Sequence, residues 1–178
     1  MKLSTDRILL VAILLLAGGL IWVVSGTLQV RIIEAGDTAP DFSIVDEHGR
    51  TMTRSDFGGK ILALNFWASW CPPCLEELPS MNEFTREYAG QGVVVLGISI
   101  DKNEKLYKRF ITQRQVAFDT ARDPEADISG SYGTFQIPET YIIDRNGKVL
   151  EKTADAFNWM DPQFLERVKV MLASPSGG

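Results

Sequence analysis

The four-residue motif Cys71-Pro-Pro-Cys74 holds both cysteines of the chain and constrains its fold more than any other feature. An apolar run, Ile61–Trp67, precedes the motif, and apolar residues at helical spacing follow it. This order predicts a buried strand, a short turn and a helix that begins at the cysteines. Because two thiols at a helix N-terminus can alternate between dithiol and disulfide, the motif predicts redox chemistry.

The two cysteines are expected to have different roles. Cys71 should occupy the N-cap of the helix, where the positive end of the helix dipole favours a thiolate. Pro72 and Pro73 lack N–H groups, so the N–H of Cys74 is the nearest helical donor. Cys74 should be shielded one turn further along. We therefore predict that Cys71 attacks a substrate disulfide and that Cys74 resolves the mixed disulfide.

Other uses of the cysteine pair fit the sequence less well, although an inert pair stays an alternative. A zinc site needs more ligands, and the single histidine, His48, falls in a predicted turn. Attachment of haem c needs a histidine after the second cysteine, where the chain has Leu75. The net charge of −5 argues against nucleic-acid binding. We expect no metal and no cofactor beyond the redox-active disulfide Cys71–Cys74.

Two polar residues near the motif need an explanation. Cys74 must lose a proton before it can resolve a mixed disulfide, and Glu77 lies three residues on, on the same helix face. Glu77 is therefore a candidate base, and an ordinary solvated carboxylate is the alternative. Asn65 lies in the predicted buried strand and must find hydrogen-bond partners there; we interpret it as a satisfied core amide.

The N-terminal segment predicts a membrane location. Ile8–Val24 contains no charged residue, and as a helix it would be about 26 Å long, close to the thickness of a bilayer core. Its length and the poor cleavage site after Val24 favour a retained single-pass transmembrane helix over a cleaved signal peptide, which would release a secreted domain. Lys2 and Arg7 predict a cytoplasmic N-terminus and hence an extracytoplasmic domain.

The rest of the chain predicts one α/β domain. We divide the chain into a membrane segment (1–26), a linker (27–35), a domain (36–174) and a flexible tail (175–178). Alternating strands and helices, closed by a hairpin and a helix, indicate a mixed central sheet flanked by helices. Beyond the motif, the predicted elements are a hairpin at 41–53, strands at 93–100 and 116–120, helices at 103–115 and 161–173, a weak helix at 124–132, and a hairpin at 139–152.

Three stretches together resemble one family: GDTAPDFSIVDEHGR, NFWASWCPPCLEELPSMNEF and IPETYIIDRNGKV. They are similar to the TlpA/ResA-type thioredoxin-like family within the AhpC/TSA–redoxin group, over about residues 36–173. The resemblance implies a thioredoxin-like fold with an added N-terminal β-hairpin and a central insertion. It also implies a monomeric protein-disulfide reductase on the periplasmic side of the bacterial cytoplasmic membrane. Cytochrome c maturation is a common task of the family, with apocytochrome c as substrate and a CcdA/DsbD-type membrane carrier as electron donor.

The resemblance also assigns roles to individual residues. Cys71 matches the family's exposed nucleophile and Cys74 its resolving thiol. Pro138 matches a cis-proline whose loop faces the cysteines and pairs with substrate backbone. Glu77 matches an acidic residue implicated near the active site, whereas Asn65 departs from the buried aspartate of cytoplasmic thioredoxins. The residues expected to bind substrate are Trp70, Pro72, Pro73, Ile137 and Pro138.

Two other functions within or near this group are the alternatives. A peroxidase of the peroxiredoxin type would carry Pro-x-x-x-Thr-x-x-Cys around its reactive cysteine. Here the corresponding positions before Cys71 are Leu64 and Ala68, so that pocket is missing. A Sco-type metal-handling protein would need a wider cysteine spacing and a late histidine, and the sequence has neither.

Overall fold

The structure is a computed structural model that describes residues 5–27 and 31–174 of the chain. The chain separates into two compact units, Met1–Arg31 and Ile32–Gly178. The predicted tail, 175–178, lies outside the described residues.

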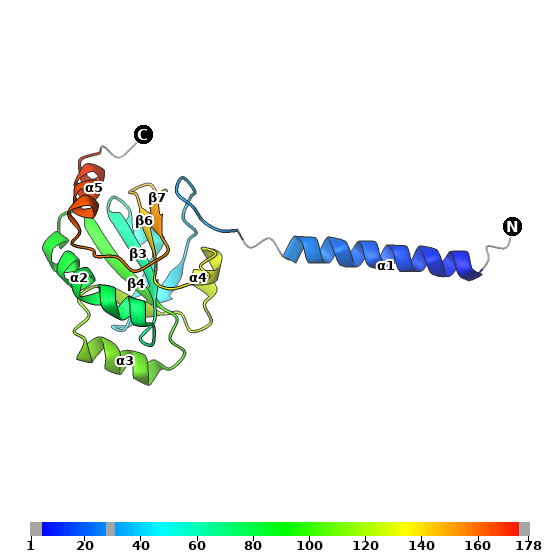
Figure 1. Ribbon diagram of the computed structural model, residues 1–178, viewed down its shortest axis with the longest axis horizontal. Helices are drawn as coiled ribbons and strands as arrows, with labels where there is room; N and C mark the ends of the chain where they lie inside the picture. The colour runs from blue at the N-terminus through cyan, green and yellow to red at the C-terminus, as the bar shows by residue number, and fades with distance from the viewer. Residues whose placement is uncertain (1–4, 28–30, 175–178) are drawn as a thin grey trace. The chain divides into compact units, whose positions relative to one another are not determined.

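The first unit contains the helix α1 (Thr5–Thr27), shown in blue in Figure 1. Its large apolar side chains between Ile8 and Val23 are all more than half exposed. In the ranges 5–27 and 31–174, no helix combines the length and the apolar character needed to cross a membrane. The transmembrane assignment of this segment therefore stays a prediction.

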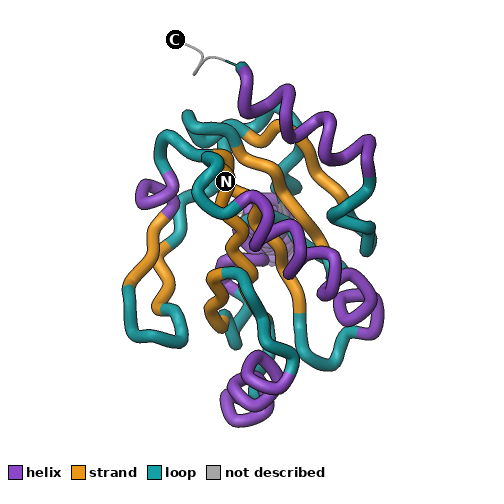
Figure 2. Tube along the Cα trace, turned by 90° about the vertical axis from the view of Figure 1, so that its left-hand side faces the viewer, coloured by secondary structure: helices purple, strands orange, loops and turns teal. Residues whose placement is uncertain are grey.

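The second unit is built on a five-stranded sheet with the order β5-β4-β3-β6-β7 (Figures 1 and 2). Strands β3, β4 and β5 run parallel, and β6 and β7 are antiparallel to their neighbours, so the predicted mixed sheet is confirmed. The strands are β3 (Ile61–Trp67), β4 (Val93–Ser99), β5 (Asp119–Arg122), β6 (Glu139–Ile143) and β7 (Val149–Thr153).

Helices cover one face of the sheet, and Figure 2 shows the three long ones in front of the strands. They are α2 (Pro72–Tyr88), α3 (Glu104–Gln113) and α5 (Pro162–Ala173); a short α4 (Asp127–Ser131) precedes β6. Alternate residues of β3 face opposite sides of the sheet. Ala63 and Trp67 join the core under these helices, whereas Leu64 and Phe66 join the core of the other face. By the same alternation Asn65 falls on the α2 side.

The residues before β3 cover both edges of the sheet. β1 (Ser43–Val45) and β2 (Thr51–Thr53) form the predicted antiparallel hairpin, followed by a 3-10 turn, η1 (Arg54–Phe57). Asp46 pairs with Ala121 of the edge strand β5. At the opposite edge, the Gly36 N–H donates to the Val149 carbonyl of β7 at 2.8 Å. Ile33, within the predicted linker, is buried in this domain.

One predicted strand is displaced. The pattern at 116–120 predicts a strand, but β5 begins only at Asp119. The N–H of Val116 donates to the Ile111 carbonyl, which ends α3, and the N–H of Ala117 donates to Oδ1 of Asn82 on α2. Because these two amides already have partners, strand pairing starts later. The other predicted strands and helices of the domain are confirmed within a few residues.

Candidate active site

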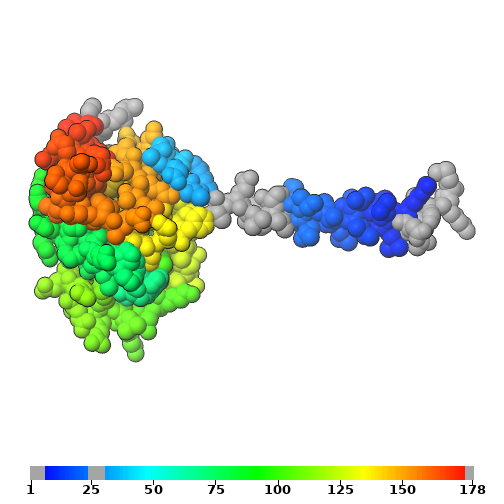
Figure 3. All heavy atoms as spheres, in the orientation of Figure 1, coloured from blue at the N-terminus to red at the C-terminus, as the bar shows by residue number. Residues whose placement is uncertain are grey.

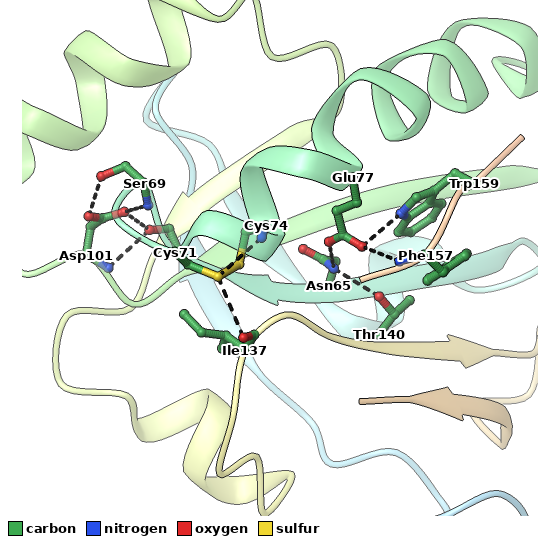
Figure 4. Close-up of a disulfide and its surroundings, with 11 residues drawn as sticks. Asn65, Ser69, Cys71, Cys74, Glu77, Asp101, Ile137, Thr140, Phe157 and Trp159 are labelled. Atoms are coloured by element: carbon green, nitrogen blue, oxygen red, sulfur yellow. Dashed lines mark hydrogen bonds between the residues drawn. A yellow bond between two sulfur atoms is a disulfide. The ribbon is translucent and has the colours of Figure 1, made fainter. Parts of the chain in front are cut away.

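Three segments meet at one end of the sheet. The cysteine motif follows β3, Asp101 follows β4, and Pro138 precedes β6. β4 runs parallel to β3, so their carboxyl ends lie together, and β6 runs antiparallel, so its start lies beside the end of β3. The topology therefore places the two cysteines between Asp101 and the loop before β6, as Figure 4 shows.

The cysteines form a disulfide at the start of α2. Cys71 is the N-cap residue, and its Sγ accepts a hydrogen bond from the Cys74 N–H at 3.3 Å. Pro72 and Pro73 occupy the first two helical positions, where a missing N–H costs no helical hydrogen bond. This confirms the predicted N-cap and the predicted role of the Cys74 amide as the nearest helical donor.

The loop before β6 faces the disulfide. The Ile137 carbonyl oxygen lies 3.6 Å from Sγ of Cys71, and the Ile137–Pro138 peptide bond is cis, as the resemblance implies. Pro138 is buried and Ile137 is half-buried. Two large apolar side chains close to this contact in the chain are exposed, Trp70 by 61% and Phe135 by 73%. The disulfide is thus bordered by the Ile137 carbonyl and by exposed apolar side chains.

The expected difference in exposure between the cysteines is wrong for this disulfide form. Cys71 is 3% exposed and Cys74 is 4% exposed, so neither is open to solvent. Cys71 is covered because the Ile137 carbonyl lies against its sulfur. The family resemblance implied an exposed nucleophile. The sequence did not show that the Ile137 carbonyl would cover Cys71.

A buried carboxylate, Asp101, holds the loop that leads into the motif. Its two oxygens accept hydrogen bonds from the Ser69 N–H (2.8 Å), the Ser69 hydroxyl (2.7 Å) and the Ser99 hydroxyl (2.7 Å). Hydrogen bonds to a carboxylate are stronger than those between neutral groups. Asp101 therefore ties the ends of β3 and β4 together immediately before Cys71.

Glu77 is buried, one turn after Cys74 on α2. Its Oε1 accepts from Nδ2 of Asn65 at 3.0 Å, and its Oε2 accepts from Nε1 of Trp159 at 3.4 Å and from the Phe157 N–H at 3.5 Å. Burial raises the pKa of Glu77 from 4.5 to about 7, and these hydrogen bonds offset the shift only in part. The structure thus excludes the alternative of an ordinary solvated helix carboxylate.

Asn65 bridges two elements beneath the motif. Its Nδ2 donates both to Glu77 and to the Thr140 hydroxyl of β6, at 2.9 Å. Its Oδ1 is buried and has no hydrogen-bond partner among the described residues. The prediction of a satisfied core amide therefore holds for the nitrogen of Asn65 but not for its oxygen.

Five polar or aromatic residues of the site were not predicted from the sequence: Ser69, Asp101, Thr140, Phe157 and Trp159. Phe157 and Trp159 belong to the segment between β7 and α5, which has no periodic pattern. Figure 3 shows this orange segment packed against the green residues of α2. Asp101 could have been predicted, because a polar residue directly after a buried parallel strand lies at the same end of the sheet as the motif.

The described residues, 5–27 and 31–174, contain no group of three or more His, Cys, Asp or Glu side chains that could hold a metal ion. His48 lies in the β1–β2 turn, 3.4 Å from a Glu47 oxygen, on a different part of the domain from the cysteines.

Comparison with known proteins identifies the family of the chain. The profile of the AhpC/TSA family matches residues 35–152. The thiol-disulfide oxidoreductase ResA of Bacillus thuringiensis subsp. konkukian is 36% identical over 120 residues, 67% of this chain and 69% of that protein. The ResA of Geobacillus thermodenitrificans is 35% identical over 138 residues, 77% of this chain and 79% of that protein.

Solved structures agree with the sequence comparison. The thiol:disulfide interchange protein DsbE of Chlorobium tepidum superimposes with a TM-score of 0.73 at 31% identity, over 80% of this chain and all of that chain. A protein disulfide isomerase of Bacteroides thetaiotaomicron gives a TM-score of 0.72 at 28% identity, over 82% of this chain and 92% of that chain. With its disulfide at the start of α2, the chain belongs to the AhpC/TSA family and is a thiol-disulfide oxidoreductase with a thioredoxin-like fold.

Proposed function

We propose that the domain reduces disulfide bonds of other proteins through a dithiol/disulfide cycle of Cys71 and Cys74. The observation that carries this proposal is the Cys71–Cys74 disulfide at the N-terminus of α2, facing the Ile137 carbonyl. In the dithiol form, the Cys71 thiolate attacks one sulfur of the substrate disulfide, and the other sulfur leaves as a thiolate. The Cys74 thiolate then attacks Cys71, releases the second substrate thiolate and leaves two electrons with the substrate.

The borders of the disulfide supply the substrate contacts. The backbone at Ile137 and Pro138 is positioned to pair with a substrate segment, in keeping with the family resemblance. Trp70 is exposed beside the motif, and Pro72 and Pro73 are exposed at the start of α2. An extended segment around the substrate cysteine can therefore lie against apolar groups while its sulfur reaches Cys71.

Glu77 is the proposed acceptor for the proton of Cys74. It follows Cys74 by one helical turn, is buried, and has a pKa raised by burial to about 7. A carboxylate with a pKa near neutrality accepts a proton at physiological pH more readily than a solvated one does. Asn65 has no titratable group to compete for this role.

Cysteine variants test the proposed cycle. Cys71→Ser should abolish the reduction of insulin disulfides, since the attacking thiolate is lost. Cys74→Ser should keep the first attack and accumulate mixed disulfides, which non-reducing gels and mass spectrometry detect. Turnover retained by Cys71→Ser would overturn the proposal.

We also propose that the domain works on the extracytoplasmic side of a bacterial cytoplasmic membrane, attached by segment 1–26. The run of exposed apolar side chains on α1, preceded by Arg7, supports this location. Cell fractionation tests it: the full-length chain should remain with the membranes and be open to protease from outside. A shortened, soluble protein would instead indicate a cleaved signal peptide and a secreted domain.

The proposed partners follow from the family resemblance. Apocytochrome c is the proposed substrate, and a membrane thiol-disulfide carrier of the CcdA/DsbD type is the proposed electron donor. Mixed disulfides trapped by Cys74→Ser should contain apocytochrome c, whereas their absence in a cytochrome-producing strain would contradict this task. Measuring the Cys71–Cys74 reduction potential tests the direction of electron flow.

A further inference from the structure

Among the described residues, the hydrogen bonds that reach the Glu77 carboxylate all come from N–H groups. Oε2 faces the Trp159 indole N–H and the Phe157 backbone N–H, and Oε1 faces the Asn65 amide N–H. This arrangement suits a carboxylate, which only accepts hydrogen bonds. It does not suit a protonated carboxyl group, which must also donate one.

The two donors at Oε2 decide where a proton can bind. Trp159 is fully buried and packs against both Phe84 and Phe164, so its indole is held in place. The second donor is a backbone N–H and cannot be reversed by a side-chain rotation. A proton taken up by Glu77 therefore belongs on Oε1. At Oε1, however, the new O–H donor faces the N–H donor of Asn65, whose Nδ2 lies 3.0 Å away, and two donors cannot bond to each other.

A half-turn of the Asn65 amide removes this conflict. The turn exchanges Oδ1 and Nδ2, so the oxygen takes the place that now lies 3.0 Å from Glu77 and 2.9 Å from the Thr140 hydroxyl. An amide oxygen accepts two hydrogen bonds, and a hydroxyl can donate as well as accept. At the other end, Oδ1 is buried and unpartnered among the described residues, so the turn breaks no hydrogen bond there.

We propose that Asn65 is a positioning residue whose amide reverses when Glu77 takes up a proton and returns when the proton leaves. No covalent bond changes other than the proton transfer from Cys74 to Oε1 of Glu77, a step that rests on the proposed function. In Figure 4 the Asn65 oxygen points toward the disulfide side and its nitrogen toward Glu77. The reversal thus turns two N–H donors toward the side of Cys74 as that cysteine becomes a thiolate.

The oxidised protein gives a clean test, because the cysteines do not titrate as a disulfide. We would follow the Glu77 side-chain carbon and the Asn65 side-chain amide by NMR from pH 4 to pH 9. The Asn65 amide shifts should change with the same midpoint as Glu77. The NOEs from its NH2 protons to Thr140 should be absent at low pH, where Glu77 is protonated, and should appear with the same midpoint as the pH rises. Glu76 lines the same cavity of about 420 Å³ as Glu77, and Glu76→Gln should leave this behaviour unchanged.

Asn82 is the matched control within the chain. Asn82, on α2, is buried like Asn65. In contrast to Asn65, both ends of its amide have partners: Oδ1 accepts from the Ala117 N–H, and Nδ2 donates to the Gln115 carbonyl. Neither partner titrates, so the amide of Asn82 should stay constant through the Glu77 transition. If Asn65 behaves like Asn82 while Glu77 titrates, the inference is wrong and the Glu77 proton points into the cavity instead.

Glu77→Gln supplies a second, pH-independent measurement. The Trp159 and Phe157 N–H groups select the oxygen of Gln at the Oε2 position, so its NH2 group faces Asn65. Asn65 should then be reversed at every pH, with no NOE from its NH2 protons to Thr140. Those NOEs persisting in Glu77→Gln would also overturn the inference. Failure of the cysteine cycle would show in the Cys71→Ser assay, so the two failures are distinguishable.

Discussion

Two buried carboxylates lie on opposite sides of the disulfide, and their surroundings differ (Figure 4). Asp101 accepts three hydrogen bonds of 2.7 to 2.8 Å, two of them from hydroxyl groups. Glu77 accepts three of 3.0 to 3.5 Å, all from N–H groups of residues distant in the chain. The two carboxylates are thus buried to a similar degree, but the hydrogen bonds to Asp101 are shorter than those to Glu77.

This difference supports a structural role for Asp101 and the proposed reactive role for Glu77. The short hydrogen bonds of Asp101 hold Ser69, and through it the turn before Cys71. The longer hydrogen bonds of Glu77 leave burial as the dominant influence and raise its pKa to about 7. Asp101 thus holds the turn that precedes the disulfide, and the raised pKa of Glu77 supports the proposal that Glu77 accepts a proton during the cycle.

The largest expected effect is kinetic. Glu77→Gln should slow the Cys74-dependent resolution of a mixed disulfide by at least about a hundredfold at pH 7, the usual contribution of a positioned base. The attack by Cys71 should change much less. Rapid-mixing measurements on a Cys71 mixed disulfide separate the two steps. If both steps slowed equally, Glu77 would have a structural role like that of Asp101.

The second effect is on stability. The folded-state pKa of Glu77, about 7, exceeds the ordinary value of 4.5, so folded protein holds a proton that unfolded protein releases between these values. Stability should therefore fall as pH rises from about 4.5 to 7, by about 3 kcal/mol in total. Urea unfolding of the oxidised protein at pH 5 and pH 8 measures this loss. Glu77→Gln should remove it; a pH dependence that survives in this variant would assign the loss to other groups.

Asp101→Asn should act on stability rather than on proton transfer. Replacing a charged acceptor of three hydrogen bonds by a neutral amide should cost about 2 kcal/mol. The shape of the pH–rate profile should not change. Asp123→Asn is the matched control, since Asp123 is a buried acceptor of three backbone N–H groups at the start of α4. A shifted pH profile in Asp101→Asn alone would break the distinction between the two carboxylates.

The smallest effect concerns one donor to Glu77. Trp159→Phe removes the indole N–H, a hydrogen bond of about 1 kcal/mol, and so should raise the pKa of Glu77 further. NMR titration of the Glu77 side chain measures the shift. Phe164→Leu disturbs the same aromatic cluster without removing a donor, so it should leave the pKa unchanged. An equal shift in both variants would mean that packing, not the hydrogen bond, sets the pKa.

Most of the fold could be predicted from local patterns. The apolar run of β3, the helical spacing of α2 and the turn residues of both hairpins each report on nearby chain. β5 was misplaced because its start depends on Asn82, 35 residues away, which binds the Ala117 amide. A local pattern contains no information about such a contact.

The site was only partly predictable for the same reason. Cys71 and Cys74 came from the short CxxC motif, Pro138 came from the family resemblance, and Glu77 came from helical spacing. The residues that change the chemistry of Glu77 lie 12, 80 and 82 positions away, so the sequence alone could not show that its carboxylate is buried. The closed state of Cys71 likewise depends on Ile137, 66 positions away.

The coverage of the sheet edges has a consequence for how this protein meets other chains. Exposed edge strands offer unpaired backbone groups to which foreign peptides can add. Here Asp46 occupies the edge of β5, where Arg50 also bridges Asp46 and Asp119, and the Gly36 region occupies the edge of β7. An unfolded substrate is thereby denied strand addition, with its risk of aggregation, at these positions. Transient encounters are left to the loops around the disulfide, where a bound chain can be released once its sulfur has reacted.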